Sequence, residues 1–249
     1  MVKISQPIAK TGSPADWPVP PLPLTEYGEN AQEHLASGKK EFDNMRAACA
    51  QFGVFLQGMA RMLDFGCSNG RVTRWYPTTN CEVWGSDIQM DKVLWAQENL
   101  GPPLRFLVNG VEAHLPFPDG YFDYVAAQSV FTHVVGSHVA WLLELCRILS
   151  RNGVLFITLH DEATLDPQRT PRAQKLLNTH FKGIQEIAPD LKQVGFLAMN
   201  PYTRVDKLAQ VYMTREYLAR ALPPWMSLVG MVERAYSDLQ TAYILRKQF

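Results

Sequence analysis

The sequence LDFGCSNGRV, at residues 63–72, decides the fold. Its first residues extend an apolar run from Met62 that is typical of a β-strand, and Gly66 and Gly70 follow directly. A glycine-bearing turn between a strand and a helix marks the first strand of many open α/β sheets. In such sheets, ligands bind beyond the carboxyl ends of the strands, where a helix N-terminus offers free N–H groups to an anion. We therefore expect a helix after Gly70 and a ligand site at this turn.

Outward from this turn, short apolar runs alternate with longer amphipathic stretches. The alternation predicts an α/β fold with a doubly wound, mostly parallel sheet, and the last two strands predict a C-terminal antiparallel β-hairpin with a turn at Ser237-Asp238. The expected helices span about 29–52, 91–100, 137–149 with Ser137 as a plausible N-cap, and 214–220. The expected strands span 62–65, 83–86, 104–108, 122–127, 153–159, 225–234 and 239–245.

Proline divides the chain. Six of the 17 prolines lie in the first 26 residues, so residues 1–28 are expected to form an extended arm without regular helix. Residues 29–249 are expected to form one domain. Within it, the proline-containing and charged stretch 161–206 is expected to be an insertion or lid.

Composition excludes several classes of protein. The 249 residues contain 24 Lys+Arg and 24 Asp+Glu, and this neutral balance argues against a nucleic-acid binder. No apolar run approaches the roughly 18 residues of a membrane span, and the N-terminus has no apolar stretch typical of a secretory signal, so a soluble, cytoplasmic protein is expected. The four cysteines and six histidines show no metal-ligand spacing, and no metal is expected.

An acidic residue ends the second predicted strand. Asp87 lies 23 positions after Asp64 (87 − 64), which suits a carboxylate that hydrogen-bonds ribose hydroxyls. Together with the turn, it predicts a site for an adenosine-like ligand with an anionic group. The alternative is that Gly66 and Gly70 only make a tight connection and Asp87 only caps a helix. The spacing is G-x-x-x-G rather than G-x-G-x-x-G, so a dinucleotide is not the first choice.

Five segments, in this order, resemble the motifs of class I S-adenosylmethionine-dependent methyltransferases. The resemblance covers about residues 61–159 and implies a Rossmann-like methyltransferase fold with S-adenosylmethionine as cofactor. The segments are DFGCSNGRV (64–72), GSDI (85–88), LPFPDGYFD (115–123), SVFTH (129–133) and LSRNGVL (149–155).

The resemblance also implies a role for each part of the cofactor site. The turn 66–68 would lie against the methionine moiety and Asp64 would hold its amino group; Asp87 would take the ribose hydroxyls; residues 109–111 would face the adenine edge; residues 128–129 would lie beside the sulfonium. Ile88 would pack on the adenine. The implied cofactor-binding residues are Asp64, Gly66, Cys67, Ser68, Gly70, Asp87, Ile88, Asn109, Gly110, Val111, Gln128 and Ser129.

Two residues depart from the family pattern. Ser68 replaces the usual middle glycine, which costs energy if that position requires a positive φ. Asn109 stands where aspartate is frequent; its amide oxygen can accept a hydrogen bond from an adenine amino group, but without charge assistance. The sequence leaves open whether these departures weaken cofactor binding, and it does not predict loss of binding.

The acceptor side is less defined. His133, just beyond the fourth strand, is the first candidate for a catalytic base; equally, it could only hydrogen-bond to backbone or water. His160 is a second polar candidate, at the end of the fifth strand. Tyr27, Trp75 and Tyr76 are candidates for an acceptor pocket, and the plainer reading is that they pack in the core or on the surface.

The sequence thus predicts a methyltransferase that acts on a small-molecule or sugar-like acceptor by in-line transfer. One alternative is a non-catalytic S-adenosylmethionine-binding protein, for which Ser68 and Asn109 are the hints; another is a nicotinamide-dependent reductase. The sequence does not distinguish O-, N- and C-methylation and leaves the oligomeric state open.

Overall fold

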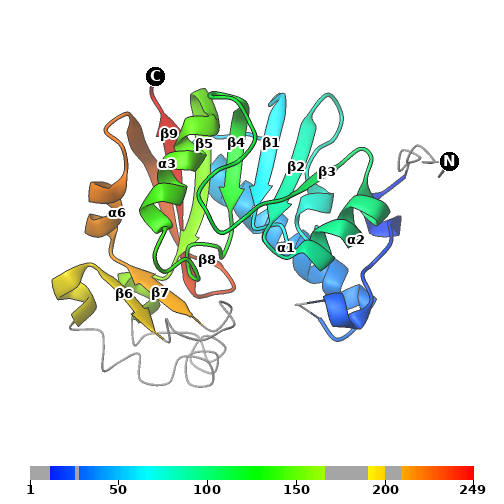
Figure 1. Ribbon diagram of the computed structural model, residues 1–249, viewed down its shortest axis with the longest axis horizontal. Coiled ribbons are helices and arrows are strands. Elements are labelled where there is room, and N and C mark those ends of the chain that lie inside the picture. Colours follow the sequence, from blue (N-terminus) through cyan, green and yellow to red (C-terminus); the bar gives the residue numbers. More distant parts are fainter. Residues whose placement is uncertain (1–11, 26–27, 166–189, 200–208) are drawn as a thin grey trace.

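A seven-stranded sheet forms the centre of the computed structural model, which describes residues 12–25, 28–165, 190–199 and 209–249 (Figure 1). The strand order is β3-β2-β1-β4-β5-β9-β8. The first five strands run parallel, and β9 is antiparallel to both β5 and β8. The predicted fold class is therefore confirmed, hairpin included. The strands are β1 (Arg61–Phe65), β2 (Glu82–Asp87), β3 (Arg105–Val108), β4 (Phe122–Ala127), β5 (Leu149–Leu159), β8 (Met226–Tyr236) and β9 (Gln240–Lys247).

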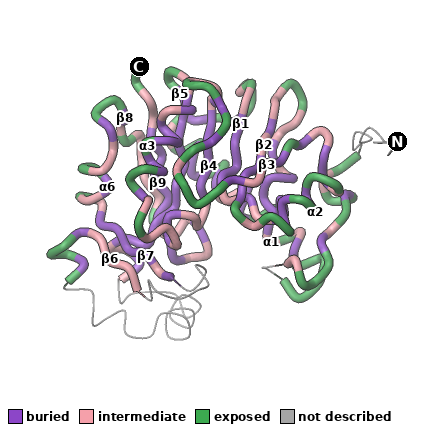
Figure 2. Tube along the Cα trace, in the orientation of Figure 1, coloured by how far each residue is buried: buried purple, intermediate pink, exposed green. Residues whose placement is uncertain are grey.

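Helices cover both faces of this sheet. Successive residues of β1 point to opposite faces: Met62 belongs to one apolar cluster with Met45 and Val93, and Leu63 to a second with Leu142. The buried residues concentrate in the central strands (Figure 2), as expected for parallel strands that are covered on both sides. Around the sheet lie α1 (Ala31–Ala50), α2 (Met90–Leu100), α3 (His138–Ile148) and, further along the chain, α6 (Arg215–Ala221).

The predicted helix after Gly70 does not form. Only a single 3-10 turn, η3 (Thr73–Trp75), follows the glycine turn. Gly70 has a φ of +78°, and Pro77 biases the residue before it toward extended backbone; Tyr76 accordingly has ψ 146°. Too few residues remain between the two for an α-helix. The expected anion site at a helix N-terminus is therefore absent from this turn.

The N-terminal arm is not uniformly extended. Its described part contains two single 3-10 turns, η1 (Pro14–Asp16) and η2 (Leu22–Leu24), each with proline in its first two positions, where a missing N–H removes no helical bond. Two side chains after β1 hold the arm. Arg74 donates to the carbonyls of Pro14 (3.1 Å) and Trp17 (2.7 Å), and Asn69 donates to that of Leu24 (2.7 Å).

A second, two-stranded sheet was not predicted. It pairs β6 (Phe196–Met199) with β7 (Gln210–Met213), and Tyr212 of β7 forms a bridge to His160 at the end of β5. The predicted insertion 161–206 contributes β6 and the 3-10 turn η4 (Glu162–Leu165); its residues 166–189 and 200–206 lie outside the described part of the chain.

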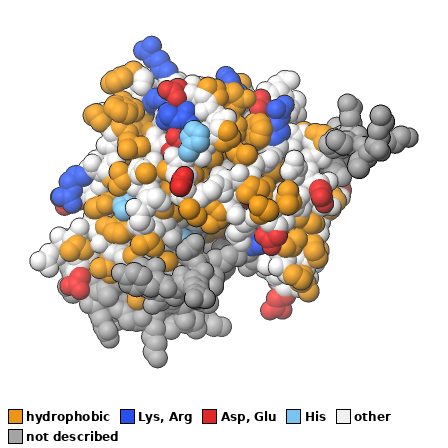
Figure 3. Space-filling model, in the orientation of Figure 1, with side chains coloured by type: hydrophobic (Ala, Val, Ile, Leu, Met, Phe, Trp, Pro, Cys, Tyr) orange, Lys and Arg blue, Asp and Glu red, His pale blue; other side chains and the backbone are white. Residues whose placement is uncertain are grey.

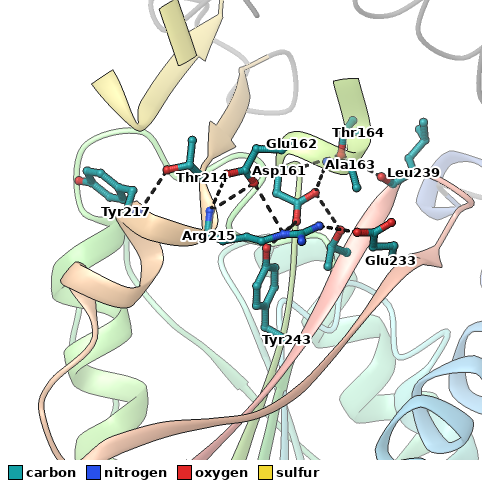
Figure 4. A network of polar contacts seen from close by, with 11 residues as sticks. Asp161, Glu162, Ala163, Thr164, Thr214, Arg215, Tyr217, Glu233, Leu239 and Tyr243 are labelled. Carbon is teal, nitrogen blue, oxygen red and sulfur yellow. Dashed lines mark hydrogen bonds and ion pairs between the residues drawn. The ribbon is translucent and has the colours of Figure 1, made fainter. Parts of the chain in front are cut away.

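A buried carboxylate joins the hairpin to the rest of the molecule (Figure 4). Asp161, fully buried directly after β5, accepts hydrogen bonds from Thr241 (2.8 Å) and Tyr243 (2.5 Å) of β9. It also accepts one from the Arg215 guanidinium at the start of α6 (3.3 Å), which in turn donates to Glu233 of β8 (2.6 Å). We call these five residues the Asp161 clamp.

Within the described ranges, no helix combines the length and the apolar character that a membrane span requires.

Candidate functional site

A cavity of about 990 Å³ opens at the carboxyl ends of β1, β2 and β4. It lies where the strand order reverses, between β1 and β4, which is the crevice where open α/β sheets bind ligands. Its volume is at the upper end of the range of small-molecule pockets. Twelve of the sequence-predicted site residues line it: Asp64, Gly66, Cys67, Ser68, Asp87, Ile88, Asn109, Gly110, Val111, Gln128, Ser129 and His133.

The turn after β1 has a left-handed backbone at Gly66, Ser68 and Gly70. At Gly66 (φ +81°), a Cβ atom would lie 2.2 Å from the side chain of Val130, so only glycine fits. Ser68 (φ +51°) adopts a conformation that costs an L-residue roughly 1–2 kcal/mol. Its backbone N–H donates to Asp87 Oδ2 (2.7 Å), which holds the turn against the end of β2. The departure from the family's glycine is therefore a strained position in the folded protein.

Gly70 lies outside the cavity. A Cβ atom there would approach Leu100 of α2 at 2.6 Å and the ring of Phe106 in β3 at 3.2 Å. This glycine permits close packing between the turn and neighbouring elements, and the structure does not support its predicted contact with the cofactor.

Asp87 connects two strand ends. Its Oδ1 accepts from the N–H of Gln89 (2.9 Å) and its Oδ2 from that of Ser68. The N-cap of α2 is Gln89, so Asp87 is not the cap that the alternative reading required. A carboxylate oxygen can accept two hydrogen bonds, which leaves Asp87 capacity for hydroxyl donors in the cavity.

Asp64 is a buried acid on the cavity wall. Burial raises its pKa to about 6, and the nearby Asp87 carboxylate acts in the same direction. A hydrogen bond from Thr73 Oγ1 (2.6 Å) and the charge of Arg71 oppose this rise. The carboxylate is therefore poised to gain from a cationic group placed beside it.

Asn109 is bonded within the protein. Its side-chain oxygen accepts from Ser86 Oγ (2.6 Å), and its side-chain nitrogen donates to the Gly110 carbonyl (2.8 Å). One lone pair of the oxygen remains for a ligand, fewer than the sequence suggested. Beside it, Ile88 and Val111 expose 46% and 68% of their surface and line the cavity, so they offer apolar walls for a flat ring.

Two polar atoms test whether a polar ligand fits. Ser68 Oγ and Gln128 Oε1 are buried and have no hydrogen-bond partner among the described residues, and both residues line the cavity. Buried polar atoms are nearly always hydrogen-bonded. With the two carboxylates and the apolar walls, these atoms fit an adenosine-like ligand that carries a polar, cationic tail, as S-adenosylmethionine does.

His133 lines the cavity with a defined orientation. Its Nδ1 lies 2.9 Å from the backbone carbonyl of Ala209, which precedes β7. A carbonyl can only accept, so the neutral ring carries its proton on Nδ1, and Nε2 is the basic nitrogen. In this tautomer Nδ1 anchors the ring to the Ala209 carbonyl, and Nε2 has the lone pair that a general base needs.

The remaining predicted acceptor residues lie elsewhere. Tyr76 is buried in the core, where its ring packs on Phe42 at 5.4 Å and its hydroxyl lies 3.6 Å from the Met45 sulfur. Trp75 packs beside the same core, and His160 stacks on Tyr212 at 5.2 Å. None of the three lines the cavity, because the extended backbone before Pro77 and the β7 bridge direct them into packed regions. Tyr27 lies outside the described residues.

The sequence reasoning missed several lining residues. Arg71 directly follows the glycine turn and donates to Ser37 Oγ and to the Tyr236 hydroxyl, both at 3.3 Å. Its position in the quoted motif could have identified it. Tyr236 carried no such signal, because it reaches the cavity from the end of β8, 165 residues further along the chain. The other unpredicted lining residues are Thr25, Phe65, Val72, Gln89, Val130, Val134, Val135, Gly136, Ser137 and Trp141.

Comparison with known proteins also points to a site for S-adenosylmethionine. Residues 63–157 match the family model described as a methyltransferase domain. This range includes all five segments in full. It also includes every residue that lines the cavity except Thr25 and Tyr236.

Three solved structures illustrate the likeness of fold. An S-adenosylmethionine-dependent methyltransferase from Mesorhizobium loti has a TM-score of 0.59 at 14% identity, covering 84% of this chain and 98% of that one. The PH0226 protein from Pyrococcus horikoshii OT3 has 0.58 at 15%, covering 89% and 94%. The N-methyltransferase NodS from Bradyrhizobium japonicum WM9, in complex with S-adenosyl-L-homocysteine, has 0.53 at 10%, covering 85% and 87%.

Proposed function

We propose that this chain, which carries a class I S-adenosylmethionine-dependent methyltransferase domain, is an enzyme that methylates a small-molecule or sugar-like acceptor. The observation that carries the proposal is the cavity at the ends of β1, β2 and β4. It brings together two buried carboxylates, polar atoms that have no partner among the described residues, and exposed apolar walls. His133 lies on the same cavity wall, so a base and the cofactor site share one space.

The residues present suit an in-line transfer. S-adenosylmethionine, when bound, would supply a methyl group on a positively charged sulfur, and transfer of this group to the lone pair of an acceptor would leave S-adenosylhomocysteine. The protein has to align the two reactants and exclude water. Asp87 would hold the ribose and Asp64 the amino group, while His133 Nε2 would take the proton of a hydroxyl or amine acceptor.

The surface favours a small acceptor over nucleic acid. On the face drawn in Figure 3, basic and acidic side chains are interspersed, and the whole chain is neutral. A nucleic-acid binder usually presents a basic patch or stripe. We also propose that the β6–β7 segment closes the acceptor side, because the carbonyl of Ala209 contacts His133. No membrane or nucleic-acid partner is part of this proposal.

Cofactor binding is tested first. Calorimetric titration with S-adenosylmethionine, S-adenosylhomocysteine and NADH in parallel should show micromolar binding of the first two alone. Asp87→Ala should abolish it, since the turn at Ser68 and the ribose contacts are both lost, whereas Asp91→Ala, an exposed acid in the first turn of α2, should bind as the wild type does. Binding of NADH alone would refute the proposed function.

A non-catalytic binding protein is the second candidate, favoured by the strain at Ser68 and the engaged amide of Asn109. An acceptor screen that follows S-adenosylhomocysteine production separates the two. An enzyme should yield this product with at least one acceptor, and His133→Ala should lower kcat about 100-fold if His133 is the base. His114→Ala, whose side chain is 78% exposed, is the matched control. Tight binding without product for any acceptor would favour the non-catalytic candidate.

A further inference from the structure

We propose that Gln240, on the C-terminal hairpin, is a positioning residue for the cofactor site and acts through Ser129. The proposal rests on the proposed function, because it assigns a role toward the ligand of the same cavity. Gln240 does not line the cavity itself, so it touches no ligand. Its influence has to pass through the residues that it holds.

Gln240 is buried at the first position of β9 and uses both ends of its amide. Its nitrogen donates to Ser129 Oγ (2.8 Å), and its oxygen accepts from Thr158 Oγ1 (2.6 Å). Thr158, fully buried in β5, accepts in turn from the backbone N–H of Ser129 (2.7 Å). The three residues therefore form a closed ring of hydrogen bonds, the Gln240 ring, which spans the loop after β4, β5 and β9.

The ring holds a strained residue. Ser129 has a φ of +56°, a left-handed conformation that serine adopts only when its surroundings impose it. Two of the three bonds of the ring end on Ser129, one on its backbone and one on its side chain. They fix both the backbone and the rotamer of this residue.

The strained residue sets the cavity wall. Ser129 and its neighbour Gln128 both line the cavity, and Gln128 Oε1 is one of the buried atoms without a partner in the described part of the chain. Because the direction of Gln128 depends on the backbone of Ser129, the hairpin determines where this acceptor atom meets the ligand. The amide of glutamine offers one donor and one acceptor at this reach, so it completes the ring without placing a charge in the buried site.

Gln240→Met removes both bonds at nearly constant volume. We expect the Kd of S-adenosylhomocysteine to rise about tenfold, because the wall at Gln128 and Ser129 relaxes. Thr241→Val is the matched control: Thr241 is the next residue of β9, is fully buried, and donates to Asp161 (2.8 Å) outside the ring. It should lose comparable stability and keep the wild-type Kd.

The route through Ser129 is tested by a double-mutant cycle. If Gln240 acts through Ser129, Gln240→Met combined with Ser129→Ala should raise the Kd no further than the larger single effect. Additive effects, or a Kd of Gln240→Met equal to that of Thr241→Val, would overturn the proposal. A wild-type protein that binds no S-adenosylhomocysteine would instead contradict the proposed function.

Gln240→Glu should make the Kd depend on pH, which a simple loss of stability would not do. A protonated carboxyl can donate to Ser129 Oγ and accept from Thr158, as the amide does. The carboxylate can only accept, so the Ser129 hydroxyl would have to turn and donate to it, and a charge would be buried in the ring. We therefore compare the Kd of Gln240→Glu for S-adenosylhomocysteine with the wild-type Kd at the same pH. The ratio of variant to wild type should be close to one at about pH 5 and should rise severalfold at about pH 8.

The effect of other ionisable groups on the Kd cancels when each variant is compared with the wild type at the same pH. Asp161 beyond Thr241, Tyr236 opposite Gln240 in β8, and Asp64 and His133 in the cavity are present in every variant. Wild type and Thr241→Val measured at each pH therefore give the reference. A ratio for Gln240→Glu that does not change with pH would contradict the donor role of Gln240.

Discussion

At the scale of single residues, the turn after β1 combines a strained backbone with a buried charge. Ser68 is left-handed, and Asp64 is an acid that is 3% exposed. Neither is the choice that maximises stability, because glycine would remove the strain and a neutral side chain would remove the cost of burying charge. Such costs are common at functional sites, where binding rather than stability decides the residue.

The first prediction concerns Asp64. Its pKa is about 6 in the folded protein and 3.8 ordinarily, so the unfolded chain releases this proton at lower pH than the folded protein. The protonated Asp64 carboxyl therefore favours the folded state. This contribution to the free energy of unfolding, about 3 kcal/mol, is fully present below about pH 4 and is lost as pH rises through about 6. Asp64→Asn should be more stable than the wild type at pH 7 by up to this amount and should bind S-adenosylhomocysteine more weakly.

Urea unfolding of Asp64→Asn and the wild type at several pH values between 4 and 8 measures the difference in their free energies of unfolding. Asp91→Asn, at an exposed position, is the control and should follow the wild-type profile. Equal profiles for Asp64→Asn and wild type would show that the carboxyl is not buried as described.

The second prediction concerns Ser68. Ser68→Gly relieves about 1–2 kcal/mol of left-handed strain and costs about 0.5–1 kcal/mol of chain entropy, whereas Ser68→Ala keeps the strain. The glycine variant should therefore be about 1 kcal/mol more stable than the alanine variant in urea unfolding. If alanine equals or exceeds glycine, position 68 is not left-handed in solution.

At the scale of elements, the segment after β1 forms a 3-10 turn in place of the predicted helix, and this turn binds the N-terminal arm. Because Pro77 ends the segment early, Arg74 lies in a single 3-10 turn and points to the N-terminal arm. Arg74 is fully buried, and burial lowers its pKa to about 10. The arm thus obtains two hydrogen bonds from one buried cation, and its residue Thr25 completes the cavity wall.

The third prediction is that Arg74→Met releases the arm. The carbonyls of Pro14 and Trp17 lose a charged donor, which we expect to cost about 2 kcal/mol locally. Endoproteinase Asp-N, which cleaves on the N-terminal side of aspartate, should then cut between Ala15 and Asp16 at least about tenfold faster, since cleavage follows the population of the open arm.

Arg46→Met is the control, because Arg46 forms an exposed ion pair with Asp43 at 3.5 Å and no other ion pair within the described part of the chain. Its cleavage rate should equal that of the wild type. An unchanged rate in Arg74→Met would mean that the apolar contacts of Trp17, not the guanidinium, hold the arm.

At the scale of the whole molecule, the C-terminal hairpin completes both the sheet and the site. It adds β9 and β8 beside β5, brings Tyr236 to the cavity, and forms both the Gln240 ring and the Asp161 clamp. Residues 240 and 241 point to opposite faces of the strand, so one strand serves the cavity and the clamp at once.

The fourth prediction is that Asp161→Ala destabilises the whole fold. It leaves the hydroxyls of Thr241 and Tyr243 without their acceptor and removes the buried partner of Arg215. Each buried hydroxyl left without a partner costs about 1–3 kcal/mol, and Arg215 is half-exposed, so we expect a total loss of about 3 kcal/mol. Urea unfolding measures this loss.

Glu216→Ala is the control, since Glu216 and Arg220 form an exposed pair at 3.6 Å with side chains 80% and 65% exposed. It should change stability by less than about 0.5 kcal/mol. A similar small change for Asp161→Ala would show that the hairpin does not depend on the clamp.

Local patterns in the chain were sufficient to predict the sheet. Period-two and period-3.6 apolar patterns depend on neighbouring residues alone, and they predicted β4 at its observed bounds and α2 to within one residue. The hairpin turn at Ser237 and Asp238, both with positive φ, follows equally from local preference. The residues placed at the carboxyl ends of β1, β2 and β4 likewise follow from chain direction, because parallel strands end at one edge.

Contacts between distant segments decided the rest. The turn after β1 lost its predicted helix through Pro77, a local signal that was overlooked, but Tyr76 and His160 were misplaced because their burial depends on α1 and β7. Arg71, Tyr236 and Gln240 acquire their roles only when the hairpin closes against the first strands. A hydrogen bond across 165 residues leaves no periodicity in the sequence, so only the folded chain reveals it.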